Sequence, residues 1–325
     1  MALKEEILLR LREKDGYLSG EELSGALDVS RTAIWKAVKA LRDSGYEIES
    51  ATNRGYRLTA SPDILIPEEI KSGLETGKLA KSVFCYDTVD STNEEAKRQA
   101  LNGAPSGSLF AAEQQTKGKG RLGRSWASPV GNGLWFSLLL RSNLIPARIT
   151  DVTLLAGLAV CRAIRKSTGC TAMIKWPNDI VIGSKKVCGI LTEMAAEMDR
   201  VDYVVVGIGI NVNVEIFPEE LTIKATSLRL ETGEKVHRVG LLQEILREFD
   251  GLLCNQGYPG EEFLKEYKEL CVSLNHRVGF NRDNRLFSGI AVDISPTGEL
   301  IVQCDDGAIF PVSSGEVTVQ GIYGQ

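Results

Sequence analysis

The sequence predicts an α+β protein of three domains, and three observations support this fold class. Residues 1–60 show apolar residues at helical spacing, followed by a short hairpin pattern. Residues 66–270 alternate between strand-like and helix-like segments, which is typical of a mixed α/β domain. Residues 271–325 alternate apolar and polar side chains between turn signals, which indicates a small all-β domain. The predicted domains are therefore 1–65, 66–270 and 271–325.

The composition limits the classes of function. The chain is 43% hydrophobic and 25% charged, as in ordinary globular proteins, and its net charge of −5 means that DNA binding would need a local basic patch. Charges interrupt the apolar N-terminal stretch MALKEEILLRLREK, so we expect neither a signal peptide nor a membrane span, and a cytoplasmic location. Seven cysteines without CxxC spacing and only two histidines disfavour a disulfide framework, a zinc site and histidine-based catalysis.

Three helices and a hairpin are predicted in the first domain. The first two helices are predicted over residues 4–14 and 19–27. The third starts after Ser30, a good N-cap, and ends before Gly45, which is typical of a helix C-terminus. The third helix has an apolar stripe on one face and the cations Arg31, Lys36, Lys39 and Arg42 on the other. Strands at 46–50 and 55–58 would form a hairpin with Arg54 near its tip.

This order is typical of a winged helix-turn-helix, in which the second helix of the motif enters the major groove of DNA and the wing touches the backbone. Interpreted this way, the DNA-contact candidates are Ser30, Arg31, Thr32, Lys36, Lys39 and Arg54. A three-helix protein-interaction module with a solvated charged face is the alternative that the pattern leaves open.

The central domain contains seven predicted strands and two prominent helical stripes. The stripes include Leu154, Leu158 and Cys161 in one helix and Leu242 to Leu252 in another. The predicted strands are 82–86, 109–113, 133–140, 172–176, 179–182, 187–195 and 201–214.

The stretch KGKGRLGRSW, residues 117–126, combines four cations with three glycines and has no acid. Glycines allow backbone N–H groups to turn toward an anion and the cations neutralise it, so the stretch suits a phosphate or carboxylate ligand. It lacks the GxxxxGK[ST] pattern of a Walker loop. Taken alone, it is also compatible with a mobile solvated loop.

Two further motifs strengthen the anion-binding interpretation. DSTN, residues 90–93, opens a polar helix, and KWPNDIVIGSKKVCGIL, residues 175–191, predicts a hairpin whose turn carries Lys185 and Lys186. A carboxylate that attacks the α-phosphorus of ATP brings two anions together, and unit charges at ~4 Å repel by about 4 kcal/mol near a protein surface. Cations and N–H dipoles must offset this repulsion, and a loop that orders over bound ligand would exclude water from the acyl-adenylate. The motifs together predict a site that activates a carboxylate with a nucleotide.

As a set, these motifs resemble the bifunctional biotin protein ligase and biotin operon repressor family. The resemblance rests on DSTN, EQQTKGKGRLGRSW, KWPNDI, KKVCGIL and VGIGINVN, in this order, after SGEELSGALDVSRTAIWKAV, and it covers essentially the whole chain. It implies a winged helix, a central domain similar to class II aminoacyl-tRNA synthetases and an SH3-like C-terminal barrel.

The resemblance also implies an activity and partners. Members of this family make biotinyl-5′-AMP from biotin and ATP with Mg²⁺, and transfer biotin to a lysine of a biotin carboxyl carrier protein, typically a subunit of acetyl-CoA carboxylase. The adenylate acts as corepressor, favouring a homodimer that binds operator DNA.

Site residues follow from the same resemblance. Lys186 matches the lysine that reaches the reacting carboxyl and α-phosphate, Arg121 acts beside it, and Asp179 is a candidate metal ligand or base for the acceptor lysine. The expected biotin-binding residues are Ser91, Thr92, Asn93, Gln115, Gly118, Lys119, Gly120, Arg121, Lys186, Gly189 and Gly207. The expected ATP- or adenylate-binding residues are Arg121, Arg124, Trp126, Asn178, Lys186 and Asn211.

The chain departs from the common family loop GRGRRGR at two positions, Lys119 and Leu122. A lysine lacks the bidentate fork of arginine, so ligand holding at residue 119 is affected. Leu122 removes one cation but leaves Lys119, Arg121 and Arg124, so we expect catalysis to survive. Two other hypotheses are a ligand-sensing transcription factor without catalysis and a ligase for another acid such as lipoate.

Overall fold

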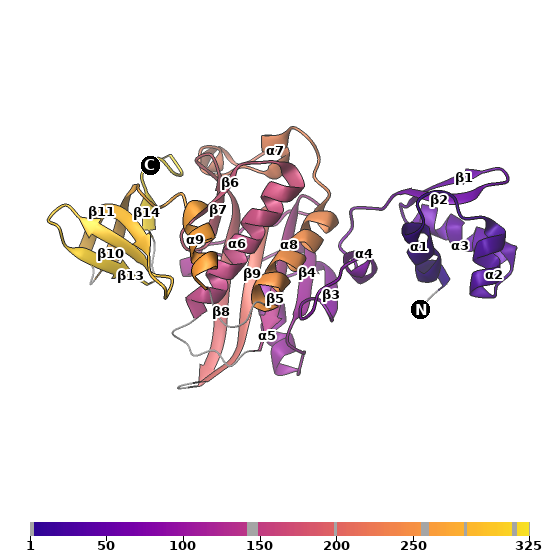
Figure 1. The fold of residues 1–325 in the computed structure, drawn as a ribbon, viewed down its shortest axis with the longest axis horizontal. Helices are drawn as coiled ribbons and strands as arrows, with labels where there is room; N and C mark the ends of the chain where they lie inside the picture. The colour runs from indigo at the N-terminus through magenta and orange to yellow at the C-terminus, as the bar shows by residue number, and fades with distance from the viewer. Residues whose placement is uncertain are drawn as a thin grey trace. The chain divides into compact units, whose positions relative to one another are not determined.

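The computed structural model describes residues 3–141, 149–197, 200–254, 260–282, 285–313 and 317–324. The chain divides into two compact units, Met1–Ile64 and Leu65–Gln325, and Figure 1 shows the elements of each. Among the described residues, none of the helices is both long and apolar enough to cross a membrane.

The first unit has the predicted winged helix-turn-helix architecture. Ser19 accepts a hydrogen bond from the backbone of Glu22, whose side chain accepts one from the Ser19 N–H, and this capping box starts the second helix. Ile34, Val38 and Leu41 are buried as their spacing predicts. The elements are α1 (Leu3–Glu13), α2 (Gly20–Leu27), α3 (Arg31–Asp43), β1 (Glu47–Ala51) and β2 (Gly55–Ala60).

The wing is held to the segment between α1 and α2. Leu18 and Tyr56 exchange two backbone hydrogen bonds of 2.8 Å, so Leu18 adds a third, one-residue strand to the β1–β2 hairpin. Gly55 has a φ of +104°, and a Cβ atom there would lie 2.0 Å from the Leu18 carbonyl oxygen. Glycine is therefore required where β2 begins, directly after the turn of the wing.

The second unit is built on a seven-stranded sheet with strand order β3-β4-β5-β9-β8-β7-β6. Its strands are β3 (Val83–Val89), β4 (Ser108–Gln115), β5 (Gly133–Leu140), β6 (Ala172–Lys175), β7 (Asp179–Ile182), β8 (Lys185–Glu197) and β9 (Arg200–Asn211). Only β3 and β4 pair in parallel; the other neighbours are antiparallel. The predicted strand positions are confirmed to within a few residues at their ends.

One detail of the predicted hairpin is wrong, because Lys185 and Lys186 do not lie in its turn. Gly183, with a φ of +58°, and Ser184 make the turn, and β8 already begins at Lys185. Neighbouring residues of a strand point to opposite faces of the sheet. Lys186 consequently lines the pocket described below, whereas Lys185 does not.

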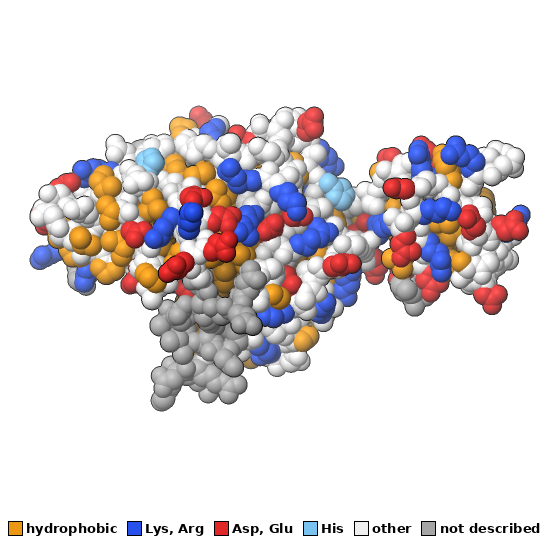
Figure 2. All heavy atoms as spheres, viewed as in Figure 1, with side chains coloured by type: hydrophobic (Ala, Val, Ile, Leu, Met, Phe, Trp, Pro, Cys, Tyr) orange, Lys and Arg blue, Asp and Glu red, His pale blue; other side chains and the backbone are white. Residues whose placement is uncertain are grey.

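Helices cover both faces of this sheet. The helices α6 (Ile149–Thr168) and α8 (Arg238–Cys254) share one large apolar core with it, and α5 (Thr92–Leu101) packs on a second cluster around Phe110, Leu139 and Val205. All residues of β5 are buried as a result. Figure 1 shows α6 and α8 side by side on the near face, and Figure 2 shows acidic and basic side chains interleaved over the same region. Several of these charges pair, such as Arg162 with Glu266.

Five strands from the last part of the chain form an antiparallel sheet, as predicted for a small all-β part. Its order is β13-β12-β11-β10-β14, and its apolar residues belong to the same core as the larger sheet. The Lys175 ammonium donates to the Val317 carbonyl at 2.9 Å, and the Trp176 indole donates to the Gly298 carbonyl at 3.0 Å. The small sheet is thus fastened to the KWPND segment. Its strands are β10 (Arg277–Arg282), β11 (Arg285–Ile294), β12 (Leu300–Cys304), β13 (Ile309–Val312) and β14 (Val317–Val319).

The remaining elements are short. They are α4 (Pro67–Lys71), η1 (Arg121–Gly123), η3 (Glu219–Leu221), α7 (Leu228–Thr232) and α9 (Glu261–Glu269).

Asp250, near the end of α8, organises the segment that leads into β3. Its buried carboxylate accepts backbone hydrogen bonds from Gly77, Lys78 and Leu79 at 2.6, 2.7 and 2.8 Å. Burial alone raises the pKa of this carboxyl, but the three N–H donors outweigh burial and lower the pKa below its usual value. The folded state therefore favours the ionised form of Asp250.

We expect Asp250→Ala to lower the free energy of unfolding at pH 7 by about 2–3 kcal/mol, since three donors lose a charged acceptor. The folded pKa lies below the unfolded value of about 3.9, so the contribution is complete well above pH 4 and is lost as pH falls through the folded pKa. Urea unfolding of both proteins between pH 3 and 7 measures this. The exposed Asp202→Ala is the matched control, and a difference that persists undiminished at pH 3 would contradict the prediction.

Candidate functional site

A cleft of about 880 Å³ lies at one end of the seven-stranded sheet. Its walls are the 118–126 loop, the start of the β7–β8 hairpin, the end of β9, residues 214–225 and part of residues 317–324. The structure brings most of the predicted ligand-binding residues into this cleft, while Gly118 lies at the base of its loop. The predicted residues that line it are Ser91, Thr92, Asn93, Gln115, Lys119, Gly120, Arg121, Arg124, Trp126, Asn178, Asp179, Lys186, Gly189, Gly207 and Asn211.

The 118–126 loop forms a closed turn. The Trp126 N–H donates to the Gly118 carbonyl at 2.8 Å, and the Gly120 N–H donates to the Arg124 carbonyl at 2.7 Å. A Cβ at Gly118 would lie 2.4 Å from the Trp126 carbonyl oxygen, so this glycine is needed for the chain to close on itself. Leu122, at the tip, is 74% exposed and has a φ of +56°. That the loop orders over bound ligand stays a prediction.

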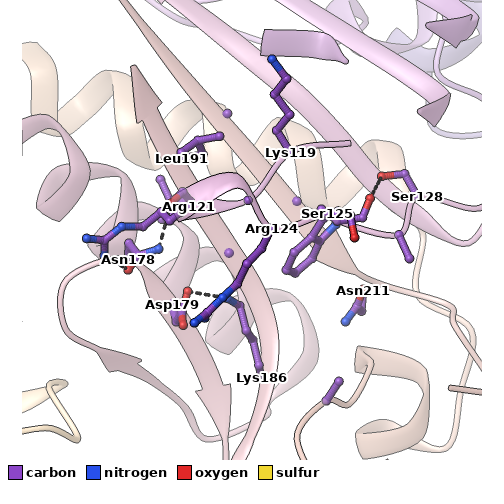
Figure 3. Close-up of a pocket in the computed structure, with 18 of the residues that line it drawn as sticks. Lys119, Arg121, Arg124, Ser125, Ser128, Asn178, Asp179, Lys186, Leu191 and Asn211 are labelled. Atoms are coloured by element: carbon purple, nitrogen blue, oxygen red, sulfur yellow. Dashed lines mark hydrogen bonds and ion pairs between the residues drawn. The ribbon is translucent and has the colours of Figure 1, made fainter. Parts of the chain in front are cut away.

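Arg121 points from this loop to the KWPND segment (Figure 3). Its guanidinium donates to the Asn178 side-chain oxygen at 2.7 Å, and the Asn178 amide donates to the Ile190 carbonyl at 3.0 Å. Because the Ile190 N–H also donates to the Asn178 carbonyl, residue 178 is fixed by β8. Arg121 is thereby positioned on a rigid part of the sheet.

Asp179 and Lys186 face each other across the β7–β8 hairpin (Figure 3). The Lys186 ammonium lies 2.6 Å from one Asp179 carboxylate oxygen, and the Tyr323 hydroxyl donates to the other at 2.7 Å. The Asp179 side chain is only 11% exposed, which strengthens both contacts. Burial and the negative charge of Asp179 raise the pKa of Tyr323 above its usual value, so the phenol stays a donor. Sequence reasoning missed Tyr323.

Lys119 has a carboxylate partner outside the group around Lys186. Its ammonium lies 2.7 Å from Glu94 on α5, and Figure 3 shows the side chain pointing away from Asp179 and Lys186. Hydrogen bonds from Lys119 and from Lys97 lower the pKa of Glu94. Lys97 in turn pairs with Glu193 at 2.7 Å. The side chain of Lys119 thus ties the loop to α5.

The DSTN segment contributes a buried polar cluster. Gln115 accepts from the backbone N–H of Thr92 at 2.8 Å, the Ser137 hydroxyl donates to the Asn93 side-chain oxygen at 2.6 Å, and the Ser137 and Thr92 hydroxyls share a hydrogen bond of 2.8 Å. A Cβ at Gly207 would lie 2.0 Å from the Asn93 side-chain oxygen, so this glycine makes room for Asn93. The cluster fixes the wall of the cleft beside Ser91, which is 2% exposed and lines the cavity.

Trp126 lies flat on the sheet where β8 and β9 carry glycines. Cβ atoms at Gly189 and Gly209 would lie 3.0 and 2.7 Å from the indole, and the Lys186 ammonium is 5.3 Å from the ring centre. Among the described residues the buried indole N–H has no hydrogen-bond partner. Asn211, close by, donates to the Thr226 carbonyl at 3.2 Å. This part of the cleft offers an aromatic face and a buried donor.

The predicted DNA-contact residues lie on the exposed surface of the first unit. Ser30 caps α3 by accepting from the Ala33 N–H at 3.2 Å, and next to Thr32, Arg31 pairs with Glu21 at 2.5 Å. Lys36 and Lys39 are exposed on α3.

Aromatic residues accompany these cations. The Lys39 ammonium lies 5.7 Å from the ring of Trp35, which is 53% exposed and was not singled out in the sequence. In the wing, the Arg54 guanidinium lies 4.4 Å from the ring of Tyr17. Arg42, predicted on the same basic face, instead donates to the Ile48 carbonyl and holds the wing.

Comparison with known proteins identifies all three parts of the chain. Residues 85–211 match the model of the biotin/lipoate A/B protein ligase family. Residues 4–57 match an HTH domain, and residues 273–319 match the biotin protein ligase C-terminal domain.

Full-length relatives carry the same combination. The chain is 42% identical to the bifunctional ligase/repressor BirA of Bacillus subtilis over 90% of each chain, and 29% identical to that of Escherichia coli over 96% of each chain. Among solved structures, the biotin protein ligase of Aquifex aeolicus in complex with biotin and ATP is 31% identical, with a TM-score of 0.64. That alignment covers 74% of this chain and 99% of the other.

Proposed function

Because the chain belongs to the family of bifunctional biotin ligase/repressors, we propose that its cleft joins biotin to AMP and then passes biotin to a lysine of a carrier protein. The observation that supports this most is the convergence on one cavity of Arg121, from the 118–126 loop, with Asn178, Asp179 and Lys186, from the β7–β8 hairpin and the residue before it. A cleft of about 880 Å³ has room for a ligand with a sugar, a base and a bicyclic acid.

In the first step, a biotin carboxylate oxygen attacks the α-phosphorus of ATP and pyrophosphate leaves. Lys186 and Arg121 offset the charge that gathers on the carboxylate and phosphate oxygens. Their contribution is selective for the transition state, since negative charge on the phosphorus oxygens is greatest there. Ser91, Thr92, Asn93 and Gln115 shape the biotin end of the cleft. Trp126 and Asn211 shape the adenine end, with Arg124 beside the phosphates.

In the second step, the amine of an acceptor lysine attacks the acyl carbon and AMP leaves. We propose a biotin carboxyl carrier protein as the acceptor and Asp179 as the group that takes the proton from the attacking amine. Asp179 is suited to this because it lies at the cleft with its carboxylate already oriented by two partners.

The residues of this cleft fit an Mg²⁺ ion that binds together with the phosphates of the nucleotide. Asp179 is the sole carboxylate that lines the described cleft, and the described residues contain no group of three candidate metal ligands. Mg²⁺ is commonly held by one or two carboxylates together with substrate phosphates and water. When bound, it would neutralise charge on the leaving pyrophosphate, and Asp179 is the protein residue that would contact it.

The first unit makes the protein a DNA-binding repressor in this proposal. Suppose one winged helix neutralises ~3 phosphates; the log–log salt slope of its binding is then near −3, and a homodimer doubles it to about −6. A single copy therefore binds weakly. Biotinyl-5′-AMP would act as corepressor by favouring the homodimer, which links the ligand to operator DNA thermodynamically.

We predict that Lys39→Ala weakens binding to operator DNA by about 3- to 10-fold and reduces the magnitude of the salt slope by about 1 per DNA-bound copy. The exposed ammonium of Lys39 on α3 is placed to contact a phosphate. Fluorescence anisotropy with labelled DNA at several salt concentrations measures both quantities. Lys71→Ala, an exposed lysine of the second unit, is the control, and an unchanged slope for Lys39→Ala would contradict the assignment.

The proposed ligase activity is tested by transfer of labelled biotin from ATP and biotin to a purified carrier domain. We expect label on the wild-type domain and none when its acceptor lysine is replaced by arginine. A protein that binds biotin and DNA but never labels the carrier would instead be a ligand-sensing transcription factor.

A further inference from the structure

Tyr323 reaches the reaction site from a segment that lies far away in the sequence. Its hydroxyl donates to Asp179 at 2.7 Å, its ring centre lies 5.0 Å from the Lys175 ammonium, and it lines the cleft. Its backbone N–H donates to the Ser184 carbonyl at 2.9 Å, in the turn of the hairpin that carries Lys186. The tyrosine is thus fixed to the same hairpin as the residues that it touches.

The other contacts of this segment reinforce that position. Lys175, which is 8% exposed, donates to the Val317 carbonyl at 2.9 Å. A Cβ at Gly324 would lie 2.7 Å from the side chain of Ile223, whose neighbours in sequence Leu221 and Lys224 line the cleft. The segment 317–324 therefore packs against the KWPND segment at one end and against Ile223 at the other.

The ion pair with Lys186 cannot be the contact that holds Asp179 throughout the proposed reaction, because Lys186 is needed by the ligand. In the proposed reaction, Lys186 turns toward the carboxylate and the α-phosphate as charge develops on them. The Asp179 side chain is 11% exposed, and a buried carboxylate is destabilised when an ammonium that pairs with it moves away. A hydrogen bond from a neutral phenol stabilises the carboxylate without drawing Lys186 back.

We propose that Tyr323 is a positioning residue for adenylation: its hydroxyl holds Asp179 in place and stabilises its charge, so that Lys186 is released to the ligand. This inference rests on the proposed function. It also makes the rate of the first step depend on residues 317–324, which lie outside the stretch 85–211 that matches the ligase family.

The test is Tyr323→Phe in the full chain, which removes one hydroxyl and keeps the ring beside Lys175. We expect the kcat of biotin-dependent ATP–pyrophosphate exchange to fall about 10-fold, the usual size for a hydrogen bond to a charged group, and the KM for biotin to stay within about twofold. Tyr267→Phe is the matched control. Tyr267 is fully buried, and its hydroxyl has no hydrogen-bond partner in the described part of the chain, so its removal should leave kcat unchanged.

A second measurement does not require catalysis. The Tm of Tyr323→Phe, of Asp179→Ala and of the double variant is measured by thermal unfolding. Because both substitutions break the same contact, we expect the decrease in Tm of the double variant to be smaller than the sum of the two single decreases. If the wild type shows no exchange, the proposed function fails, and the contact is then judged by the Tm cycle alone. Wild-type kcat in Tyr323→Phe, or additive Tm shifts, would overturn the proposal.

Discussion

Replacing Lys186 with alanine is expected to lower biotin-dependent ATP–pyrophosphate exchange by about 100- to 1,000-fold, the range found when one preorganised charge-stabilising donor is removed from an active site. The ammonium of Lys186 lies between two other residues of the cleft, 2.6 Å from the Asp179 carboxylate and 5.3 Å from the centre of the Trp126 ring. In the proposed reaction it is the cation nearest to the phosphorus, together with Arg121. Water that fills the vacated space cannot replace a fixed positive charge.

The neighbouring Lys185 provides a matched control. It belongs to the same strand, has the same side chain and does not line the cleft, so Lys185→Ala should exchange at the wild-type rate. Circular dichroism and Tm should show that both variants are folded. Exchange by Lys186→Ala within about threefold of wild type would show that the lysine does not act on the reacting groups.

Arg238→Met is expected to lower the free energy of unfolding of the second unit by about 3–5 kcal/mol, as is usual when one partner of a buried ion pair is removed. Arg238 opens α8, and its side chain is only 4% exposed. Its guanidinium donates to both carboxylate oxygens of Glu113 at 2.6 and 3.2 Å. Glu113 also accepts from the Leu65 N–H at 2.9 Å, so one pair fixes α8, β4 and the start of the second unit. Methionine retains most of the volume, and the loss is therefore chiefly electrostatic.

Urea unfolding followed by tryptophan fluorescence measures this effect, because Trp135 and Trp176 are buried in the second unit. Arg247→Met is the control: it changes a partly exposed pair with Glu244, worth at most about 0.5 kcal/mol. Adding Glu113→Gln to Arg238→Met removes the unpaired charge and should restore part of the stability. Equal losses for Arg238→Met and Arg247→Met would contradict the importance of the buried pair.

The sequence predicted what local patterns encode. Apolar spacing located α3, α6 and α8, and strand-like runs located β5 and β7 at their observed ends. These predictions succeeded because periodicity and capping act within a few residues along the chain. The motifs around Arg121 and Lys186 were likewise local, and the fold brings them to one cleft.

What the sequence did not predict depends on contacts between distant residues. Tyr323 lies in a short terminal turn without a motif, and only the docking of the small sheet brings its hydroxyl to Asp179. The resemblance implies that Lys119 binds biotin, which stays a prediction, and the fold adds a carboxylate partner for its ammonium, Glu94, that the sequence did not indicate. Gly207 lines the cleft and its role in ligand binding stays a prediction, and the structure shows in addition that it makes room for the Asn93 side chain. Such pairings follow from tertiary packing, which spacing along a chain does not reveal.

The most direct test of the account is the exchange of labelled pyrophosphate into ATP by the full chain with Mg²⁺, measured with biotin, with lipoate and with neither acid. We predict exchange that requires biotin and that lipoate does not support. The reason is that the cleft is proposed to form biotinyl-5′-AMP reversibly, before any acceptor protein takes part. No exchange with biotin, or equal exchange with lipoate, would contradict the assignment of the cleft as a biotin-activating site.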